Sequence, residues 1–338
     1  MTLRDDIRLA LPSKGRLEND ALEFLQACGL RVQKPNPRQY QAIIPAIPAL
    51  AVLFQRPGDI VVGVRQGSLD FGIAGLDSIE EKRGSNGDVI ILHDALGFGH
   101  CTLTLAVPEA WNDVNTLEDL RRHTRALVQQ ERALRVATKY PILTGRFLAQ
   151  NRIEPVSLIA AEGTLEVAPS IGYADIISDL VSSGTTLHDN RLRGLQDGAI
   201  LRSQACLIAN RRAMQTRREV LATARELLEF VEAHLRAREN FLVFANMRGE
   251  SPEAIAQHMF TRASLCGLQG PTISPVVARE QGTERWFAVN IVVHKERVMQ
   301  TIQELRAIGG SGVVVAPVTY IFEEEPARYR ALLEALHG

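Results

Sequence analysis

The sequence predicts an α/β protein with a two-lobed core followed by a smaller α+β domain. Three observations carry this prediction. Short apolar segments alternate with helical periodicity from residue 7 to about residue 190, which is typical of parallel sheets. Segments 96–101 and 198–210 each have the character of a crossing between two lobes. From residue 241 the order changes to strand, helix, strand, strand, helix, strand, which is the ferredoxin-like plan.

The composition indicates a well-cored protein of two or three domains with almost no net charge. The chain has 338 residues, 46% of them hydrophobic and 23% charged, and its formal net charge is −1. This balance gives no electrostatic reason to expect nucleic acid or a membrane surface as a partner. No apolar run reaches roughly 20 residues and no signal-peptide pattern is present, so a cytoplasmic protein is expected. Four widely separated cysteines, Cys28, Cys101, Cys206 and Cys266, are expected to be reduced thiols.

The first lobe opens with a strand, a loop and a helix. Residues 7–11 form the strand, Pro12 ends it, and residues 17–28 place apolar side chains on one helical face. The loop between them carries Lys14 and Arg16 at the helix start, which favours an anion there. The other expected elements are an irregular Pro-rich stretch at 35–50, a strand at 51–54, a turn at 56–59, an apolar segment at 60–64, a buried strand at 69–77 and a helix from residue 78.

The second lobe and the C-terminal domain continue the alternation. In the second lobe we expect strands at 102–107, 135–137 and 156–160, helices at 117–122 and 143–151, and a further helix opening at Gly163 or Thr164. A strand at 198–210 returns to the first lobe, and a basic helix at 211–238 leads to the last domain. That domain is expected to have strands at 241–245, 272–278, 286–293 and 312–321 and helices at 252–260 and 295–308.

Residues 174–187 carry the most informative chemical signal in the chain. An apolar run that includes Asp175 ends in Asp179, and a loop rich in Ser, Gly and Thr follows at once. Backbone N–H groups in such a turn bind anions, and the carboxylates can accept from sugar hydroxyls or face a hydrated Mg²⁺. A phosphorylated sugar needs both features. On local sequence alone, an ordinary strand-to-helix turn with an N-cap stays open as the alternative.

Taken in order, the segments resemble the ATP phosphoribosyltransferases over essentially the whole chain. Five segments carry the resemblance: Leu11-Pro12-Ser13-Lys14-Gly15-Arg16-Leu17, Asp70-Phe71-Gly72-Ile73-Ala74-Gly75-Leu76-Asp77, Leu96-Gly97-Phe98-Gly99-His100-Cys101, Arg135-Val136-Ala137-Thr138-Lys139-Tyr140-Pro141, and residues 174–187. The resemblance implies a core like that of type II periplasmic binding proteins, with one catalytic lobe at 1–100 and 191–238 and the other at 101–190. It implies that 239–338 form the ferredoxin-like, ACT-like regulatory domain of the long forms.

The resemblance also implies a reaction and its partners. N1 of the ATP adenine attacks the anomeric carbon of phosphoribosyl pyrophosphate, and pyrophosphate leaves with Mg²⁺. This transfer is the first step of histidine biosynthesis, and free histidine is expected to inhibit it through the C-terminal domain. Members of the family's long form assemble as dimers and hexamers, so a homo-oligomer is expected.

Individual residues take roles from the same resemblance. The expected catalytic residues are Asp175, Asp179, Lys14 and Arg16. Phosphoribosyl pyrophosphate would be bound by Asp179, Ser182, Ser183, Gly184, Thr185 and Thr186, and the nucleotide by Lys14, Arg16, Arg56, Asp77 and Lys139. Glu166 and Asp175 would face the metal, mostly through water and substrate, and Thr272, Ser274 and Ser311 would bind the regulatory histidine. Pyrophosphate is a good leaving group, so positioning and charge stabilisation suffice and no covalent nucleophile is required.

Three features depart from the family's usual pattern on the nucleotide side. Ser13 is inserted before Lys14, His100 stands where the family often has Arg, and the Pro-rich stretch before Arg56 is long. His100 either weakens an anion contact by staying neutral or is a half-buried polar residue. Three other functions stay open: a module that only binds a small anion, a regulatory paralogue without turnover, and a phosphoribosyltransferase for a different base.

Overall fold

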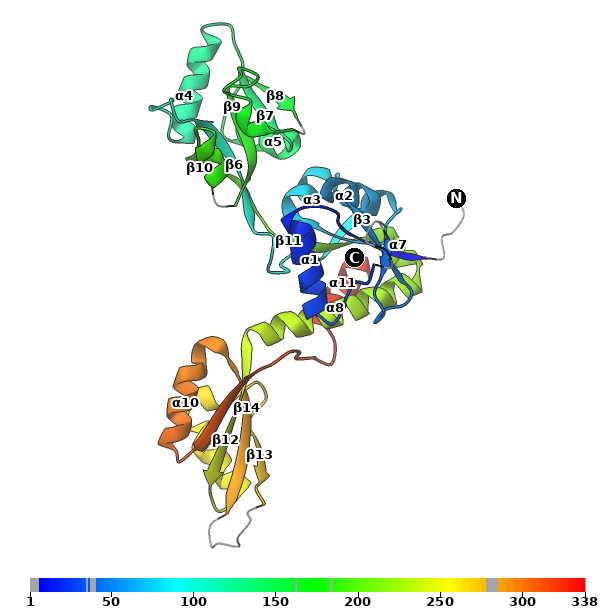
Figure 1. Ribbon diagram of the computed structural model, residues 1–338, viewed down its shortest axis with the longest axis vertical. Coiled ribbons are helices and arrows are strands. Elements are labelled where there is room, and N and C mark those ends of the chain that lie inside the picture. Colours follow the sequence, from blue (N-terminus) through cyan, green and yellow to red (C-terminus); the bar gives the residue numbers. More distant parts are fainter. Residues whose placement is uncertain are drawn as a thin grey trace. The chain divides into compact units, whose positions relative to one another are not determined.

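The chain folds into two compact units (Figure 1). The structure is a computed structural model that describes residues 6–34, 36, 41–161, 163–182, 184–277 and 285–337. Unit 1 comprises Met1–Leu228 and Ala327–Gly338, and unit 2 comprises Glu229–Pro326. Unit 1 contains two sheets, called lobe I and lobe II below, and unit 2 contains a third. The expected fold class, a two-lobed α/β core with an α+β domain, is therefore confirmed.

Lobe I is a six-stranded sheet in the order β2-β3-β1-β4-β11-β5. Its strands are β1 (Ile7–Pro12), β2 (Gln41–Ile43), β3 (Leu50–Gln55), β4 (Phe71–Gly75), β5 (Val89–His93) and β11 (Ala205–Asn210). β1 runs parallel to β3 and β4, so the carboxyl ends of these three strands meet at one edge. β4 and β11 are buried along their whole length, because helices cover both faces of a sheet of this kind.

Three helices of lobe I precede the first crossing: α1 (Arg16–Ala27), α2 (Pro57–Gln66) and α3 (Leu76–Lys82). The structure corrects the expected turn at 56–59 and apolar segment at 60–64, which together form α2. Pro57 lies at the first helical position, where its missing N–H is not needed, and Gly67 ends the helix with a φ of 75°. The apolar side chains of this segment form one buried helical stripe against the sheet.

Lobe II is a five-stranded sheet in the order β10-β6-β9-β7-β8. Its elements are β6 (Cys101–Pro108), α4 (Leu117–Val128), β7 (Leu134–Thr138), α5 (Pro141–Gln150), β8 (Val156–Ala160), β9 (Ile176–Val181), α6 (Thr185–Asp189) and β10 (Leu192–Ser203). β7 runs parallel to β8 and β9. The helix expected to open at 163 or 164 is only a single 3₁₀ turn, Leu165–Val167.

The return crossing also differs from expectation. Residues 198–210 are not one strand, because β10 belongs to lobe II and β11 to lobe I, with Gln204 between them. Ser203 pairs with Cys101 in one sheet, whereas Ala205 pairs with Gly75 in the other. The chain therefore re-enters lobe I at β11 rather than at residue 191. A change of sheet partner leaves no trace in local periodicity, so the sequence pattern missed it.

Unit 2 has the expected ferredoxin-like plan. The chain reaches it through α7 (Arg211–Thr216) and α8 (Arg218–Arg238), with an extended Arg217 between them. Its elements are β12 (Asn240–Arg248), α9 (Pro252–Phe260), β13 (Thr272–Pro275), β14 (Trp286–His294), α10 (Val298–Ala307) and β15 (Ser311–Pro317). The sheet order is β13-β14-β12-β15, and every pair is antiparallel. Alternate residues of β12 and β14 pack with α9 and α10, while the opposite face carries exposed apolar side chains such as Leu242 and Val314.

The last helix, α11 (Ala327–His337), lies in unit 1 and not in the domain expected at 239–338. Arg211 Nη1 donates a hydrogen bond of 2.8 Å to the Ala335 carbonyl. Arg328 Nη2 lies 2.6 Å from Asp94 Oδ1, and Leu332 is only 4% exposed. The chain thus leaves unit 1 through α8 and returns to it after unit 2. Within the described ranges, no helix combines the length and apolar character needed to cross a membrane.

Candidate active site

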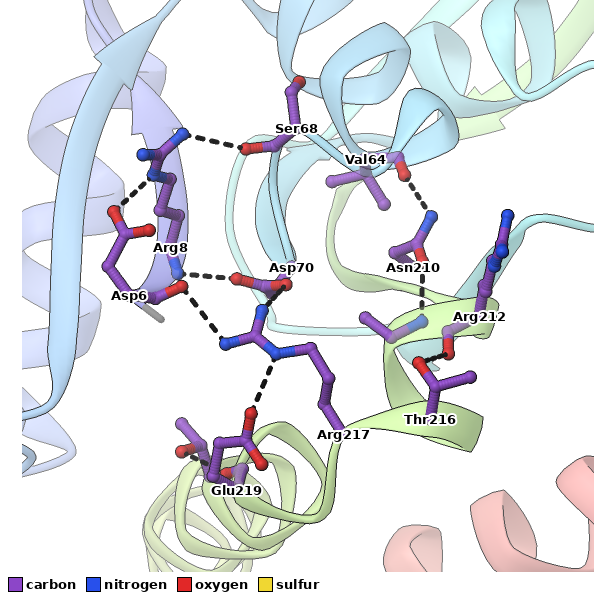
Figure 2. Close-up of polar contacts among 12 residues, drawn as sticks. Asp6, Arg8, Val64, Ser68, Asp70, Asn210, Arg212, Thr216, Arg217 and Glu219 are labelled. Atoms are coloured by element: carbon purple, nitrogen blue, oxygen red, sulfur yellow. Dashed lines mark hydrogen bonds and ion pairs between the residues drawn. The ribbon is translucent and has the colours of Figure 1, made fainter. Parts of the chain in front are cut away.

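One cavity of lobe I is lined by several arginines, and two of them belong to an ion-pair network that stabilises the fold. Its volume is 930 Å³, and its lining includes Arg8, Arg65, Arg212 and Arg217. Arg217 donates to Asp70 at 3.1 Å and to Glu219 at 2.8 Å (Figure 2). Arg8 Nε likewise donates to Asp6 at 2.6 Å. Carboxylates thus pair with Arg8 and Arg217, and the cavity lies at the amino ends of β1 and β4. Ligands of open α/β sheets bind beyond the carboxyl ends of the strands, so the active site is expected at the opposite edge of this sheet.

A cavity of 240 Å³ between the two lobes of unit 1 lies at the carboxyl end of β4. Lobe I contributes Arg16, Asp77 and His100 to its lining, and lobe II contributes Tyr140 and Ser182. Three residues predicted from the sequence, on the nucleotide side and on the phosphate side, therefore face one space. This cavity is the centre of the candidate active site.

The basic residues of lobe I gather at the same sheet edge. Lys14 follows β1 and Arg56 follows β3, and both line a neighbouring cavity of 550 Å³. The inserted Ser13 extends the parallel pairing, because its N–H donates to the Gln55 carbonyl at 2.9 Å. Lys14 is exposed, and the side chain of Arg16 is 86% exposed with only a 3.5 Å contact to Asp20. The insertion therefore leaves Lys14 on the loop after β1 and Arg16 at the first position of α1, where it lines the interlobe cavity.

In lobe II, Asp179 lies close to Lys139 and Glu166. Burial raises the pKa of the Asp179 carboxyl and the charge of Glu166 adds to this, while a hydrogen bond from the Leu180 N–H and the charge of Lys139 oppose it. The Leu180 N–H lies 2.8 Å from Asp179 Oδ1. The three side chains form a cluster of mixed charge at the end of β7 and β9. A ligand with hydroxyl donors or a hydrated cation would relieve the partial burial of this carboxylate.

The structure does not bring Asp175 into this cluster. Asp175 precedes β9, and its carboxylate accepts from the Arg135 N–H at 2.8 Å, from Arg135 Nη2 at 2.8 Å and from Arg132 Nη2 at 3.3 Å. Burial works to raise the pKa of Asp175, but the hydrogen bonds and charge of Arg135 lower it overall. With β9 rising about 3.3 Å per residue, roughly 20 Å separate Asp175 from the loop at the other end of the strand. Asp175 is thus a structural residue of lobe II.

The loop after β9 presents exposed hydroxyl groups, and Ser182 lines the interlobe cavity. Ser182, Thr185 and Thr186 are exposed, and Gly184 adopts a φ of 80° immediately before α6. Ser183 lies outside the described residues. α6 has only five residues, so the loop N–H groups and hydroxyls, more than a helix dipole, are what this segment offers an anion.

Asp77 is occupied by protein partners instead of pointing freely into the cleft. It is 4% exposed and accepts from Ser203 Oγ at 2.6 Å, from Tyr140 Oη at 2.8 Å and from Ser78 Oγ at 3.1 Å. Sequence reasoning missed Ser203 and gave Tyr140 no role of its own. Burial, followed by the charge of Asp77, raises the pKa of the neighbouring Cys101 to about 11, so this thiol stays protonated at neutral pH.

The three residues expected to bind histidine are not adjacent in unit 2. Thr272 and Ser274 lie on β13, whereas Ser311 lies on β15, at the opposite edge of the sheet. Three strand spacings separate the edges, about 14 Å at about 4.8 Å each. One histidine molecule cannot contact all three residues within a single domain.

No described group of three or more His, Cys, Asp or Glu side chains could hold a metal ion by itself. Of the expected metal residues Glu166 and Asp175, the structure keeps Glu166 near the cleft, beside Asp179. Mg²⁺ usually retains several waters and binds through one or two carboxylates and substrate phosphates. The donor set therefore fits a Mg²⁺ ion carried largely by substrate.

Comparisons with known proteins agree over nearly the whole chain. The family profile described as ATP phosphoribosyltransferase matches residues 56–232, and the profile described as the HisG C-terminal domain matches residues 237–320. The chain is 48% identical over 337 residues to "ATP phosphoribosyltransferase 2, chloroplastic" of Arabidopsis thaliana, a match that covers 98% of this chain and 81% of that protein. It is 40% identical over 228 residues to the ATP phosphoribosyltransferase of Brucella suis, a match that covers 66% of this chain and 99% of that protein.

One solved structure shares the fold of the core. It is the ATP phosphoribosyl transferase (HisG:HisZ) complex from Thermotoga maritima, and the match has a TM-score of 0.50 at 24% identity. The match covers 67% of this chain and 98% of the Thermotoga chain. Like the Brucella protein, that chain has no counterpart for about a third of this one.

Proposed function

This chain belongs to the ATP phosphoribosyltransferase family, and we propose that its interlobe cleft performs the family's reaction with the residues that the two lobes bring together. The chain is a phosphoribosyltransferase that joins ATP to phosphoribosyl pyrophosphate in the first step of histidine biosynthesis. A binding protein or paralogue without turnover, left open by the sequence, is set aside by this membership. The convergence of Arg16 and Ser182 on one cavity from opposite lobes supports the proposed site best.

Lobe II would bind the phosphoribosyl pyrophosphate. The loop hydroxyls of Ser182, Thr185 and Thr186 and the backbone at Gly184 would hold the 5′-phosphate. Ser183 stays a prediction of the same loop. Asp179 would accept from the ribose hydroxyls, and Lys139 would contact phosphate oxygens.

Lobe I would bind the nucleotide and the departing pyrophosphate. Lys14, Arg16 and Arg56 follow parallel strands that end at the cleft edge, where their charges meet anionic oxygens. Asp77 is omitted from this set because its carboxylate already accepts three hydrogen bonds from protein hydroxyls.

The reaction asks for alignment and charge stabilisation. A bond forms between adenine N1 and the anomeric carbon, while the bond from that carbon to pyrophosphate breaks and its electron pair leaves with pyrophosphate. Positive charge develops on the ribose near Asp179, and negative charge on the leaving group meets the lobe I cations. Bound Mg²⁺ would supply charge neutralisation on the pyrophosphate oxygens, with Glu166 and Asp179 placed to contact its waters. No protein nucleophile is needed, and the protonated Cys101 is unsuited to be one.

Unit 2 would provide histidine inhibition and part of a homo-oligomer interface. Its sheet has one face open with exposed apolar side chains, including Val314 at 56% exposure. A second copy packed on this face would extend the core, and dimers or hexamers are the expected assemblies. Because Ser311 and Thr272 lie on opposite edges, any shared histidine contact would need residues from two copies. A reducing compartment such as the cytoplasm suits four cysteines that form no disulfide with one another.

The decisive experiment is turnover with purified protein. ATP, phosphoribosyl pyrophosphate and Mg²⁺ should yield pyrophosphate and a phosphoribosyl-ATP identified by mass, and other nucleotides in place of ATP should not. Added histidine should lower the rate in the full chain. No product with ATP, despite binding of both substrates, would refute the proposed site; a chain ending near Arg238 that keeps activity and histidine sensitivity would refute regulation by unit 2.

A further inference from the structure

We infer that Asp77 and Glu81 of α3 form a lobe clamp with Tyr140, Ile142 and Leu143, and that this clamp sets the alignment of the two lobes for catalysis. Asp77 and Glu81 are positioning residues on this view, because they act through the lobe II residues they hold. The inference rests on the proposed function for its catalytic consequence, but the clamp itself stands on contacts within unit 1.

Glu81 caps a helix of the other lobe. Its carboxylate accepts from the Ile142 N–H at 2.9 Å and from the Leu143 N–H at 2.9 Å, and the residue is only 6% exposed. These are N–H groups of the first turn of α5, which have no partner inside the helix. The residue before α5, Tyr140, provides no side-chain cap of its own. Lobe I therefore completes a helix start that lobe II leaves unsatisfied.

Asp77 holds the same segment one helical turn away. Residues four apart on a helix share a face, so Asp77 and Glu81 project together from α3. Tyr140 Oη donates to Asp77 Oδ2 at 2.8 Å, and Tyr140 is 9% exposed. Three hydrogen bonds thus join two buried carboxylates of lobe I to three residues of lobe II, Tyr140, Ile142 and Leu143. Opening the lobes at this point would take both backbone donors from the Glu81 carboxylate and the Tyr140 hydroxyl from Asp77, unless water replaced them.

The clamp is linked to the proposed catalytic residues through buried contacts. Thr144 Oγ1, one residue beyond the clamped N–H groups, donates to Ser178 Oγ at 2.9 Å. Both residues are fully buried, and Ser178 precedes Asp179 on β9. Lys139 directly precedes Tyr140. Displacing the start of α5 would therefore displace Lys139 and Asp179 relative to Lys14 and Arg16 of lobe I.

The kinetic test uses the full chain with Glu81→Gln. The amide keeps the size of the side chain but turns one acceptor into an N–H₂ group that cannot accept from the α5 backbone. We expect kcat to fall about 10- to 100-fold, since small misplacements of reacting groups cost rate on this scale. The dissociation constant for phosphoribosyl pyrophosphate should change less than about threefold, because its proposed contacts through the ribose and the 5′-phosphate lie within lobe II. Glu81→Asp should recover part of kcat.

The matched control is Asp119→Asn. Asp119 accepts from the N–H groups of Asn115 and Thr116, each at 3.0 Å, so it too receives backbone N–H groups at a helix start, but entirely within lobe II. The Asp119→Asn variant should have a lower free energy of unfolding than the wild type but a kcat close to that of the wild type. A kcat for Glu81→Gln no lower than that of the control would overturn the inference. If Glu81→Gln does not fold, Tyr140→Phe tests the same clamp, with an expected kcat loss of about 3- to 10-fold.

A distance measurement tests whether the clamp aligns the lobes, independently of enzyme activity. Spin labels at Gln26 on α1 and Gln150 on α5, both exposed, report the separation of the lobes in a Cys266→Ser background. Wild-type protein should give one narrow distance distribution, and Glu81→Gln a broader or longer one. An unchanged distribution overturns the clamp whatever the kinetics show. Wild-type protein that makes no product refutes the proposed function, while the distance comparison still decides the clamp.

Discussion

Asp175 lies directly before β9, and Asp179 lies in β9, four residues further on. The charge of Asp175 stabilises the fold, whereas the charge of Asp179 is available to substrate. Asp175 is bound by the guanidinium groups of Arg135 and Arg132 and stabilises lobe II. Asp179 has the Leu180 N–H as a protein donor and lies near the like charge of Glu166. A charged carboxylate that is partly buried beside another carboxylate destabilises the folded protein. A bound ligand can offset this destabilisation. This difference makes Asp179, and not Asp175, the candidate for substrate contact.

Asp179→Asn should separate stability from activity. We expect kcat/KM for phosphoribosyl pyrophosphate to fall about 100-fold, as for loss of one group that stabilises transition-state charge. The free protein should become more stable at neutral pH. Burial raises the pKa of this carboxyl above its ordinary 3.8, so its charge destabilises the fold above that pH and no longer does so well below it. Urea unfolding at about pH 7 and about pH 3 measures the difference.

Asp175→Asn is the matched variant on the same strand, with the opposite expectation. It should lower the free energy of unfolding at neutral pH by about 2 kcal/mol, because charged hydrogen bonds to Arg135 are lost. The pKa of Asp175 is lowered, so its contribution is present above pH 3.8 and disappears as the pH falls through the folded value. Its kcat/KM should stay near that of the wild type. Equal losses of activity in both variants would contradict the division of roles.

At the scale of elements, the site is made where strands end and short segments begin. β1, β3 and β4 end beside Lys14, Arg56 and the start of α3, and β9 ends in the loop before α6. α6 is too short to be a strong anion site through its dipole, so its first two residues should act through their hydroxyls.

Thr185→Ala combined with Thr186→Ala tests this segment. The affinity for phosphoribosyl pyrophosphate should fall about 10- to 100-fold, since a hydrogen bond to a charged group contributes about 1.5–3 kcal/mol. The affinity for ATP should fall less than about threefold. Titration calorimetry with each substrate measures both. Ser157→Ala, which removes an exposed hydroxyl near the start of β8, should change neither. Equal losses for both substrates would argue against a phosphate-binding role for the loop.

At the scale of the whole molecule, the chain enters and leaves unit 2 through helices that are anchored in unit 1. α11 contributes Arg328, which pairs with Asp94 directly after β5. His93, the last residue of β5, is 6% exposed and accepts from the Ala95 N–H through Nδ1. Burial and the charge of Arg328 lower the pKa of His93 to about 4, while Asp94 works against this shift. The packing of α11 is therefore sensitive to acid.

His93→Asn should reduce acid destabilisation of unit 1. A lowered imidazole pKa means that the unfolded chain takes up a proton first, so stability is lost as the pH falls from 6.5 to about 4. The wild type should lose about 3 kcal/mol over this range through His93, and the variant should not, since Asn keeps a hydrogen-bond acceptor without the titration. Unfolding midpoints at about pH 7 and about pH 4 compare them. The exposed His258, changed to Asn, should leave the wild-type loss intact.

The features that the sequence predicted well are those whose signals are local. β8 and α9 occur at the expected residues, 156–160 and 252–260, because apolar spacing and the Ser251-Pro252 helix start lie in the segments themselves. α2 was mistaken for a turn, since Pro57-Gly58-Asp59 serves a turn and a helix start equally well. The sequence does not predict the division of 198–210 into two strands. The segment changes from the lobe II sheet to the lobe I sheet at Gln204, but its apolar pattern continues without a break.

The sequence by itself determined the family, the alternation of strands and helices in the core, the ferredoxin-like domain and the loop at 182–186 as the phosphate candidate. Only the tertiary structure decided which carboxylates face the cleft. Arg135 binds Asp175 across 40 residues of sequence, and Glu81 reaches the Ile142 N–H across 61. The physical reason is that a carboxylate's role depends on its burial and on the donors around it, and those donors come from distant segments.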